Sequence, residues 1–322
     1  MSIVSIAPQK SFSTRAWAEM LFLAMLWGGS FVANRLALNE LGVFTTVALR
    51  VLGGCTVIWI YIALRRLPLP RDPKIWAALL VMGLLNNVVP FSLIAWGQLS
   101  IPSGLAAILN GATAIIGVLV AALALSDERL TGRKLIGVVL GFAGVATAIG
   151  IGALRALDLT SLAQLAILGA STCYAVSGVF ARVWLRGVAP QVAVAGMLTT
   201  SVLIMLPLAL WTEGVPSAPQ AASVWLGVAY LAVVSTAIAY LMFYRLLELV
   251  GAGNTSLVTL LVAPIAIVLG AVILGETLPL RAYVGFGILA LGLMVVDGRI
   301  GGRIGGRLGE AKKTLAEPVP PV

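Results

Sequence analysis

Two short stretches of the chain share a residue spacing that decides its fold. They are ERLTGRKLIG at residues 128–137 and ETLPLRAYVG at residues 276–285, and both place Glu, Leu, Arg and Gly at the same four positions. The offset between them is 148 residues, and WGGS at 27–30 corresponds to YAVS at 174–177 at an offset of 147. Because the offset hardly changes along the chain, the sequence indicates an internal duplication.

The composition places this duplicated chain in a membrane. Of the 322 residues, 60% are hydrophobic and only 10% are charged, and the mean hydropathy is +1.07. A soluble domain has about a quarter of its residues charged, so this chain has too few to cover a water-facing surface. At about 20 residues per membrane-spanning helix, the apolar content suffices for roughly ten helices and excludes large domains outside the membrane.

Ten apolar runs are separated by short polar breaks, and each run predicts one transmembrane helix. The runs cover residues 16–38, 43–64, 75–97, 103–125, 134–151, 161–182, 190–211, 222–245, 253–275 and 281–297. If the N-terminus is cytoplasmic, 17 of the 21 Lys and Arg residues lie on the cytoplasmic side, Arg35, Arg155 and Arg281 lie outside, and Arg50 lies within the second run. Since positively charged loops resist translocation, this bias predicts that both termini are cytoplasmic.

The duplication divides the ten predicted helices into two sets of five. Five is an odd number, so the second set enters the membrane from the opposite side and the repeats are inverted, as in many secondary transporters. We therefore predict an all-α membrane protein of ten transmembrane helices, with a first repeat at 16–151 and a second, inverted repeat at 152–298. A cytoplasmic segment at 1–15 precedes them. The basic tail at 299–322 is typical of a disordered cytoplasmic segment, with contact to anionic lipid as the alternative.

Several motifs carry a resemblance to a known family. They are LWGGSF at 26–31, GETL at 275–278, the paired Glu-x₄-Arg-x₃-Gly stretches and Arg50 in Ala-Leu-Arg. Together they resemble the EamA repeat of the drug/metabolite transporter superfamily and, within it, the bacterial amino-acid and metabolite exporters of the YddG type. The resemblance implies ten helices, both termini in the cytoplasm and a central cavity lined mainly by helices 1, 3, 4, 6, 8 and 9. The first repeat departs from the pattern, with Ser-Asp-Glu at 126–128 where Gly-Glu is usual.

Polar residues at the middle of a span are the candidate substrate pathway, because such side chains are costly in lipid and usually face a cavity or a partner. The candidates in the first repeat are Trp27, Ser30, Asn34, Asn86, Asn87, Pro90 and Asn110. Those in the second repeat are Tyr174, Ser177, Ser235, Thr236, Tyr240 and Thr259. Structural alternatives stay open, since hydroxyl groups can bond to their own helix and aromatic rings can serve packing. A primary amide cannot be satisfied so locally.

Pro90 and two ionisable residues add further hypotheses. Pro90 removes the helical bond to the Asn86 carbonyl, which is then free to accept from a substrate ammonium group unless the proline only kinks the helix. Glu19 lies about one turn into the first helix and is either an interface or gate residue or a proton carrier. Arg50 is expected to pair with a helix-end carbonyl or an acid, or to extend outward, rather than to touch substrate.

The pattern of charges favours a small zwitterionic substrate. Asp, Glu and His are missing from mid-membrane positions, and Lys is missing from the span interiors, so the sequence predicts a neutral pocket without a proton relay. We expect an exporter of amino acids or similar metabolites in the bacterial inner membrane that works by alternating access without proton coupling. The alternative is a proton-coupled multidrug or metabolite antiporter that uses Glu19.

Other classes of protein are disfavoured. An enzyme would need paired acids, His clusters or a metal-binding motif, and a channel would need a polar stripe along a whole helix. The basic residues lie in short segments between apolar runs, which argues against nucleic acid as a partner. We expect no cofactor or metal; the predicted partners are a small-molecule substrate and membrane lipid. The oligomeric state is left open, with a monomer as one possibility.

Overall fold

The computed structural model describes residues 13–101, 103–128, 130–149, 161–274 and 280–297, and the regular secondary structure within them is helical. The elements of the first half are α1 (Thr14–Gly28), α2 (Ser30–Ala37), α3 (Val43–Arg65), α4 (Pro73–Gly83), η1 (Leu84–Val88), α5 (Val89–Gly97), α6 (Ser103–Ala124) and α7 (Gly132–Ile149). Those of the second half are α9 (Leu162–Trp184), α10 (Pro190–Thr212), α11 (Ala222–Ala229), η2 (Tyr230–Ile238), α12 (Ala239–Val250), α13 (Ala252–Thr255), α14 (Val258–Leu274) and α15 (Leu280–Asp297).

Seven helical stretches of the described chain are long and apolar enough to cross a membrane. They are Thr14–Ala37, Val43–Arg65, Pro73–Gly97, Ala106–Ala124, Leu162–Trp184, Pro190–Thr212 and Ala222–Val250. The helices expected at 134–151, 253–275 and 281–297 are formed as α7, α14 and α15, although they are not among these seven. An all-helical membrane protein is thereby confirmed, and the count of ten spans stays a prediction.

Four predictions concern residues outside the described ranges. These are the N-terminal segment up to residue 12, the boundary between the repeats at 151/152, the tail that follows residue 298 and the motif at 275–278.

Local signals set the helix boundaries. Asp72 accepts a hydrogen bond from the backbone N–H of Lys74 at 2.8 Å, and Pro73 occupies the first turn, so α4 begins slightly before the predicted residue 75. The first span is interrupted at Gly29, where a Cβ atom would lie 2.5 Å from the Tyr230 hydroxyl oxygen. Glycine therefore lets the second repeat approach α1 closely, and the Tyr230 hydroxyl donates to the Leu26 carbonyl at 3.0 Å.

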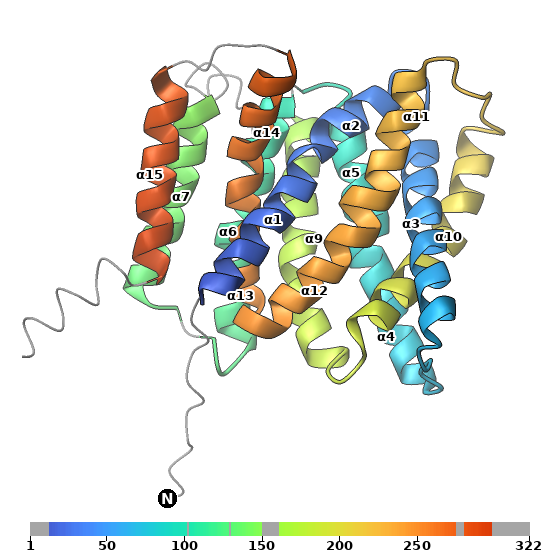
Figure 1. The fold of residues 1–322 in the computed structure, drawn as a ribbon, viewed down its shortest axis with the longest axis horizontal. Helices are drawn as coiled ribbons and strands as arrows, with labels where there is room; N and C mark the ends of the chain where they lie inside the picture. Colours follow the sequence, from blue (N-terminus) through green and yellow to red (C-terminus); the bar gives the residue numbers. More distant parts are fainter. Residues whose placement is uncertain (1–12, 102, 129, 150–160, 275–279, 298–322) are drawn as a thin grey trace, which may run out of the picture.

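The two repeats pack against one another through several pairs of helices. α3 packs against α10, and α7 packs against α15, so corresponding helices of the two halves meet. Figure 1 shows these pairs at opposite edges of the molecule, and the helices of each pair run in opposite directions. Between the two pairs lie α1, α6, α9, α12 and α14, which enclose the centre of the fold.

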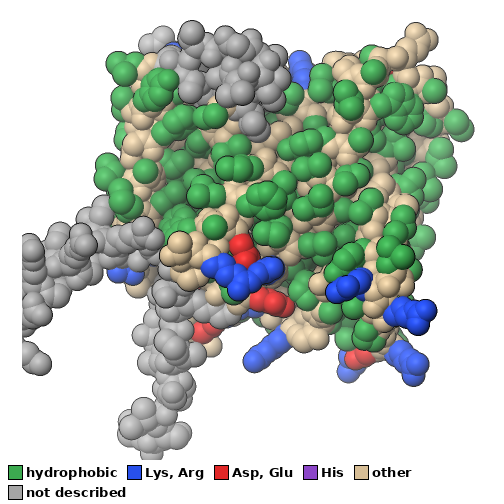
Figure 2. Space-filling view, viewed as in Figure 1, with side chains coloured by type: hydrophobic (Ala, Val, Ile, Leu, Met, Phe, Trp, Pro, Cys, Tyr) green, Lys and Arg blue, Asp and Glu red, His purple; other side chains and the backbone are tan. Residues whose placement is uncertain are grey.

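The outer surface carries the apolar side chains that lipid requires. Leu123 is 89% exposed, and Leu203 is 69% exposed. Figure 2 shows hydrophobic side chains over the middle of one face, while most of its charged side chains gather toward the end of the molecule where α1 begins. An apolar band next to a charged end is the pattern of a protein that lies in a bilayer.

Two π-helical segments occupy equivalent places in the repeats. η1 contains Asn86 and Asn87, and η2 contains Ser235 and Thr236, which are related to the asparagines by an offset of 149 residues. A π-helix widens the turn and often occurs at functional sites. Both repeats thus distort their helix where the sequence places polar side chains.

Glycines set the distance between α7 and α15. A Cβ atom on Gly144 would lie 2.4 Å from the Leu289 backbone nitrogen, and one on Gly285 would lie 2.4 Å from the Ala148 backbone nitrogen. Helix backbones in membranes approach this closely only where small residues meet. Since a backbone atom cannot move aside as a side chain can, an added methyl group would push the helices apart.

We therefore expect Gly285→Ala to lower the free energy of unfolding by about 1–3 kcal/mol, the usual cost of overpacking. Gly287→Ala is the matched control, because a Cβ atom on this glycine, two residues along α15, meets nothing within 4 Å. Thermal unfolding of the purified protein in detergent compares the two variants. Equal unfolding temperatures for both variants would refute the close packing of α7 on α15.

Candidate functional site

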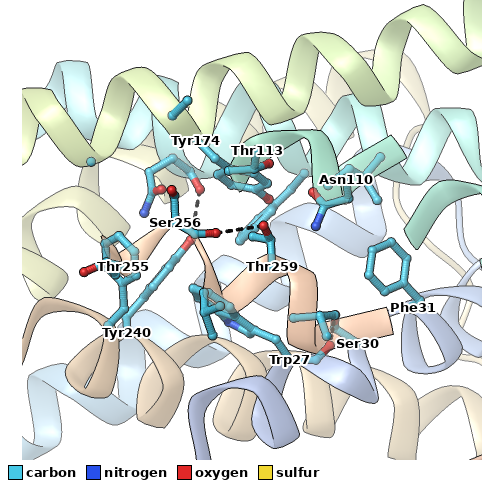
Figure 3. Close-up of a pocket in the computed structure, with 18 of the residues that line it drawn as sticks. Trp27, Ser30, Phe31, Asn110, Thr113, Tyr174, Tyr240, Thr255, Ser256 and Thr259 are labelled. Atoms are coloured by element: carbon cyan, nitrogen blue, oxygen red, sulfur yellow. Dashed lines mark hydrogen bonds between the residues drawn. The ribbon is translucent and has the colours of Figure 1, made fainter. Parts of the chain in front are cut away.

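A cavity lies at the centre of the fold, between the two repeats. Its empty space measures about 940 Å³, including the part that opens to solvent, and its walls come from α1, α2, α3, η1, α5 and α6 of the first half and α9, α12, α13 and α14 of the second. Figure 3 shows aromatic, hydroxyl and amide side chains converging on it.

The structure brings eight of the predicted pathway residues together in this wall. They are Trp27, Ser30, Asn34, Asn86, Asn110, Tyr174, Tyr240 and Thr259. Five other predicted residues do not line the cavity: Asn87, Pro90, Ser177, Ser235 and Thr236. Four of these make hydrogen bonds that hold the wall in place, and Pro90 lies in the first turn of α5.

The asparagines of η1 are bonded to neighbouring helices. Asn87 donates to Ser201 of α10 at 2.9 Å, and Ser177 of α9 lies 2.9 Å from the Asn86 side-chain oxygen. The Tyr240 hydroxyl lies 2.9 Å from the Asn86 carbonyl oxygen and 2.5 Å from the Asn87 side-chain oxygen. This carbonyl is the one that Pro90 was predicted to free for substrate, and that prediction needs correction because Tyr240 occupies it.

Other predicted residues are also held by the protein. The Trp27 indole N–H donates to the Ser235 carbonyl at 3.0 Å, which ties α1 to η2. Ser30 bonds to the Trp27 carbonyl at 2.6 Å, and Thr259 bonds to the Ser256 carbonyl at 2.8 Å. Both hydroxyl groups therefore bond to a carbonyl three residues earlier in the chain, a local bond of the kind that the structural alternative proposed.

Gln98 is a wall residue that the sequence analysis missed. Its side-chain oxygen accepts from Asn34 at 2.8 Å, and its side-chain amide donates to the Phe31 carbonyl at 3.2 Å. Arg35 donates to its backbone carbonyl. Gln98 follows the end of α5. It lies near the end of the predicted span, and the sequence candidates include only polar residues at the middle of a span.

Two polar oxygen atoms in the wall have no hydrogen-bond partner among the residues that the structure describes. They are the side-chain oxygen of Asn110 and the hydroxyl of Thr113, one turn apart on α6. Both residues are buried, at 7% and 3% exposure, and both line the cavity (Figure 3). A buried polar atom without a partner is destabilising, so these two atoms are candidates to bind a ligand.

Arg50 overturns the expectation of a neutral pocket. It lines the cavity, donates from Nε to the Thr236 hydroxyl at 2.9 Å and from a terminal nitrogen to the Ser235 hydroxyl at 3.2 Å, and lies 3.6 Å above the Phe91 ring. It therefore neither extends outward nor pairs with an acid in the described part of the chain. The partners that orient it are 185 and 186 residues away in sequence, so no residue near Arg50 indicates this position.

Glu19 lies outside the cavity wall. Its carboxylate is 3.0 Å from Arg15 one turn earlier on α1 and 3.0 Å from Arg245 of α12. Two cations therefore compensate its charge near the start of α1. This position fits the interface role better than that of a proton carrier in the pathway.

The described wall residues offer groups that can bind a small polar molecule. Among the described residues that line it, Arg50 carries the only charge, and the remainder are amides, hydroxyls, aromatic rings and aliphatic groups. No group of three or more metal-ligating residues occurs in the part of the chain that the structure describes. The arrangement can hold a small polar molecule between uncharged hydrogen-bonding groups and one guanidinium.

Comparison with known proteins agrees with this architecture. The chain is 28% identical over 290 residues to the uncharacterized transporter YvbV of Bacillus subtilis, covering 88% of this chain and 92% of that protein. It is 27% identical over 297 residues to a probable terminal-alkyne amino-acid exporter of Streptantibioticus cattleyicolor, covering 89% and 94%. A protein of known crystal structure has the same fold, with a TM-score of 0.72 and 18% identity, covering 88% of this chain and 97% of its own.

Two segments of the chain, residues 16–150 and 161–296, each match the EamA-like transporter family. The two matches together cover most of the chain and coincide with its two halves. The protein is therefore a multi-pass membrane transporter that belongs to the EamA-like transporter family.

Proposed function

We propose that this protein exports amino acids or similar small zwitterionic metabolites from the bacterial cytoplasm by facilitated, alternating-access transport. In this proposal, ten helices in two inverted repeats, at 16–151 and 152–298, span the membrane and surround the cavity. Both termini lie in the cytoplasm. The antiparallel packing of α3 on α10 and of α7 on α15 supports this inverted arrangement.

The observation that carries the proposal is the cavity wall itself. It offers free oxygen atoms at Asn110 and Thr113 and a guanidinium at Arg50, and its described residues include no carboxylate. A zwitterion presents a donor group and an anionic group that match these partners. A relative named as a probable amino-acid exporter supports the same substrate class.

Alternating access requires contacts that break when the cavity changes sides. Glu128, in the loop before α7, is bound by the second repeat: Arg182 donates to it at 2.7 Å and the Gly253 backbone N–H at 3.0 Å. Lys134 lies 3.5 Å away, and Arg182 also binds Asp127. This cluster joins the repeats at the ends of α6, α9 and α12, and we assign it to the cytoplasmic closure.

Counterflow in proteoliposomes tests the proposed function. With an unlabelled amino acid inside, labelled threonine outside and no pH gradient, the label should accumulate, because exchange through one cavity needs no other driving force. Preloading each of the twenty amino acids in turn ranks the substrates. Absence of counterflow with every amino acid, from protein shown to be folded, would refute amino-acid transport.

Glu19→Gln separates this mechanism from a proton-coupled antiporter. Because Glu19 lies outside the cavity and its charge is compensated, counterflow should stay within about twofold of wild type, as for loss of a partly exposed ion pair. Arg15→Gln removes one of its partners and serves as the control. Loss of transport in Glu19→Gln alone, with uphill uptake driven by protons in the wild type, would favour the antiporter.

The free hydroxyl of Thr113 gives a second test. Thr113→Val keeps the shape of the side chain and removes a polar atom that has no partner in the described protein, so stability should be unchanged or slightly raised. If that hydroxyl binds substrate, the half-saturation concentration should rise about fivefold, the equivalent of one hydrogen bond.

Thr172→Val is the matched control for this test. Thr172 is exposed on α9, and its hydroxyl bonds to the Leu168 carbonyl of its own helix at 2.9 Å. This variant should transport like the wild type. Equal half-saturation concentrations in both variants would remove Thr113 from the binding site.

A further inference from the structure

Arg50 is a cation whose charge the described protein leaves uncompensated. The ion pairs of the described residues are made by Arg15, Lys134, Arg182 and Arg245, so Arg50 has no carboxylate partner there. Its two hydrogen bonds go to neutral hydroxyls, and the ring below it is Phe91. These contacts fix the orientation of the guanidinium without neutralising it, and they leave three of its five N–H donors without a described protein acceptor.

Comparison of the two repeats shows that the helix contact itself does not need a charge. α3 contacts η2 through Arg50, and the equivalent contact in the other repeat is that of α10 with η1. In that second contact, the Asn87 side-chain amide donates a hydrogen bond to the Ser201 hydroxyl at 2.9 Å, and both groups are neutral. At the offset of 149 residues, the counterpart of Arg50 is Thr199. The cation is therefore specific to the first repeat and faces the cavity.

The uncompensated charge and the unpartnered oxygens lie in the same wall. Asn110 and Thr113 correspond at the same offset to Thr259 and Val262, and neither counterpart offers a free oxygen, since Thr259 bonds to its own helix and Val262 is apolar. The first repeat thus supplies both an anion-binding group and the free acceptors. A wall with a cation at one place and free hydrogen-bond acceptors at another suits a ligand that has an anionic group at one end and a donor group at the other.

We propose that Arg50 binds the carboxylate of the transported molecule and makes a carboxylate an obligatory feature of the substrate. This inference rests on the proposed function. A guanidinium binds a carboxylate through two parallel N–H donors, and such charge-assisted bonds are stronger than neutral ones. Because the described wall residues include no carboxylate to offset it, the same cation repels organic cations. Amines, amino amides and cationic drugs are therefore excluded, while zwitterions and carboxylic acids are accepted.

Matched competitors test the proposal. Leucine, leucinamide and 4-methylpentanoate compete with labelled leucine in counterflow, and the same compounds are tested for thermal stabilisation of the detergent-purified protein. Wild type should prefer leucine to leucinamide by about tenfold or more, as expected for a charged hydrogen bond. In Arg50→Gln the leucine-to-leucinamide ratio should fall toward one. A purely structural role of Arg50 would lower transport of both compounds and leave their ratio unchanged.

Two further variants keep the test decisive. Arg50→Lys retains a charge without the planar pair of donors, so it should preserve part of the preference even if Arg50→Gln fails to fold. Arg65→Gln changes an exposed arginine at the other end of α3 and should leave the ratio at the wild-type value. A tenfold preference that persists in both Arg50 variants would overturn the proposal.

The two readouts distinguish failure of this inference from failure of the proposed function. Amino-acid counterflow with equal affinity for leucine and leucinamide would keep the transport function and overturn the role of Arg50. No counterflow with any amino acid would refute the proposed function. In that case, stabilisation by 4-methylpentanoate that is absent in Arg50→Gln would still support carboxylate binding, and equal stabilisation by the carboxylate and the amide would overturn it.

Discussion

Lipid offers no hydrogen-bond partner to a peptide group or a polar side chain, and the structure of this protein follows from that constraint. Its backbone is helical wherever an apolar run crosses the fold, and hydroxyl groups on the helices bond to carbonyls of the preceding turn, as Thr172 and Thr212 do. Larger polar groups find partners on other helices, as Asn87 does on Ser201. In such a structure, a buried polar atom without a partner is unusual. At Asn110 and Thr113 such atoms lie in the wall of the cavity, whereas those of Glu19 and Thr46 lie outside it.

Because the chain is duplicated, this constraint acts on both halves, and both halves satisfy their polar groups in a similar way. η1 and η2 widen the helix at equivalent places, and each is bonded by a neighbouring helix: Ser201 contacts η1, and Arg50 contacts η2. The glycines of α7 likewise lie against those of α15, Gly137 near Gly292 and Gly144 near Gly285. A contact that occurs in both halves belongs to the shared scaffold. A feature that occurs in one half alone needs another explanation.

The sequence predicted the helices well because bilayer thickness fixes the length of an apolar run, and the positions of the runs are local information. The sequence places its candidates at mid-membrane depth, which stays a prediction, and eight of them line the cavity. It could not predict which polar side chains the protein itself would satisfy. Asn87, Ser235 and Thr236 are bonded to residues more than 100 positions away, and these contacts depend on how the helices rotate against each other. Arg50 was misjudged because nothing near it in sequence shows that η2 turns it inward.

A cavity between two inverted copies would offer the same chemistry from both sides if the copies had stayed alike. A symmetric cavity cannot orient a substrate whose two ends differ, because each end would find the same partners in either direction. This chain has lost that symmetry at the cavity wall. Arg50, Asn110 and Thr113 belong to the first repeat, and the second has Thr199, Thr259 and Val262 at the corresponding positions. The scaffold contacts are alike in the two repeats, whereas these three positions differ. They are the only described wall residue that carries a charge and the two wall residues whose side-chain oxygens have no partner. The proposed orientation of an amino acid, with its carboxylate toward Arg50, would then follow from unequal change in two copies of one repeat.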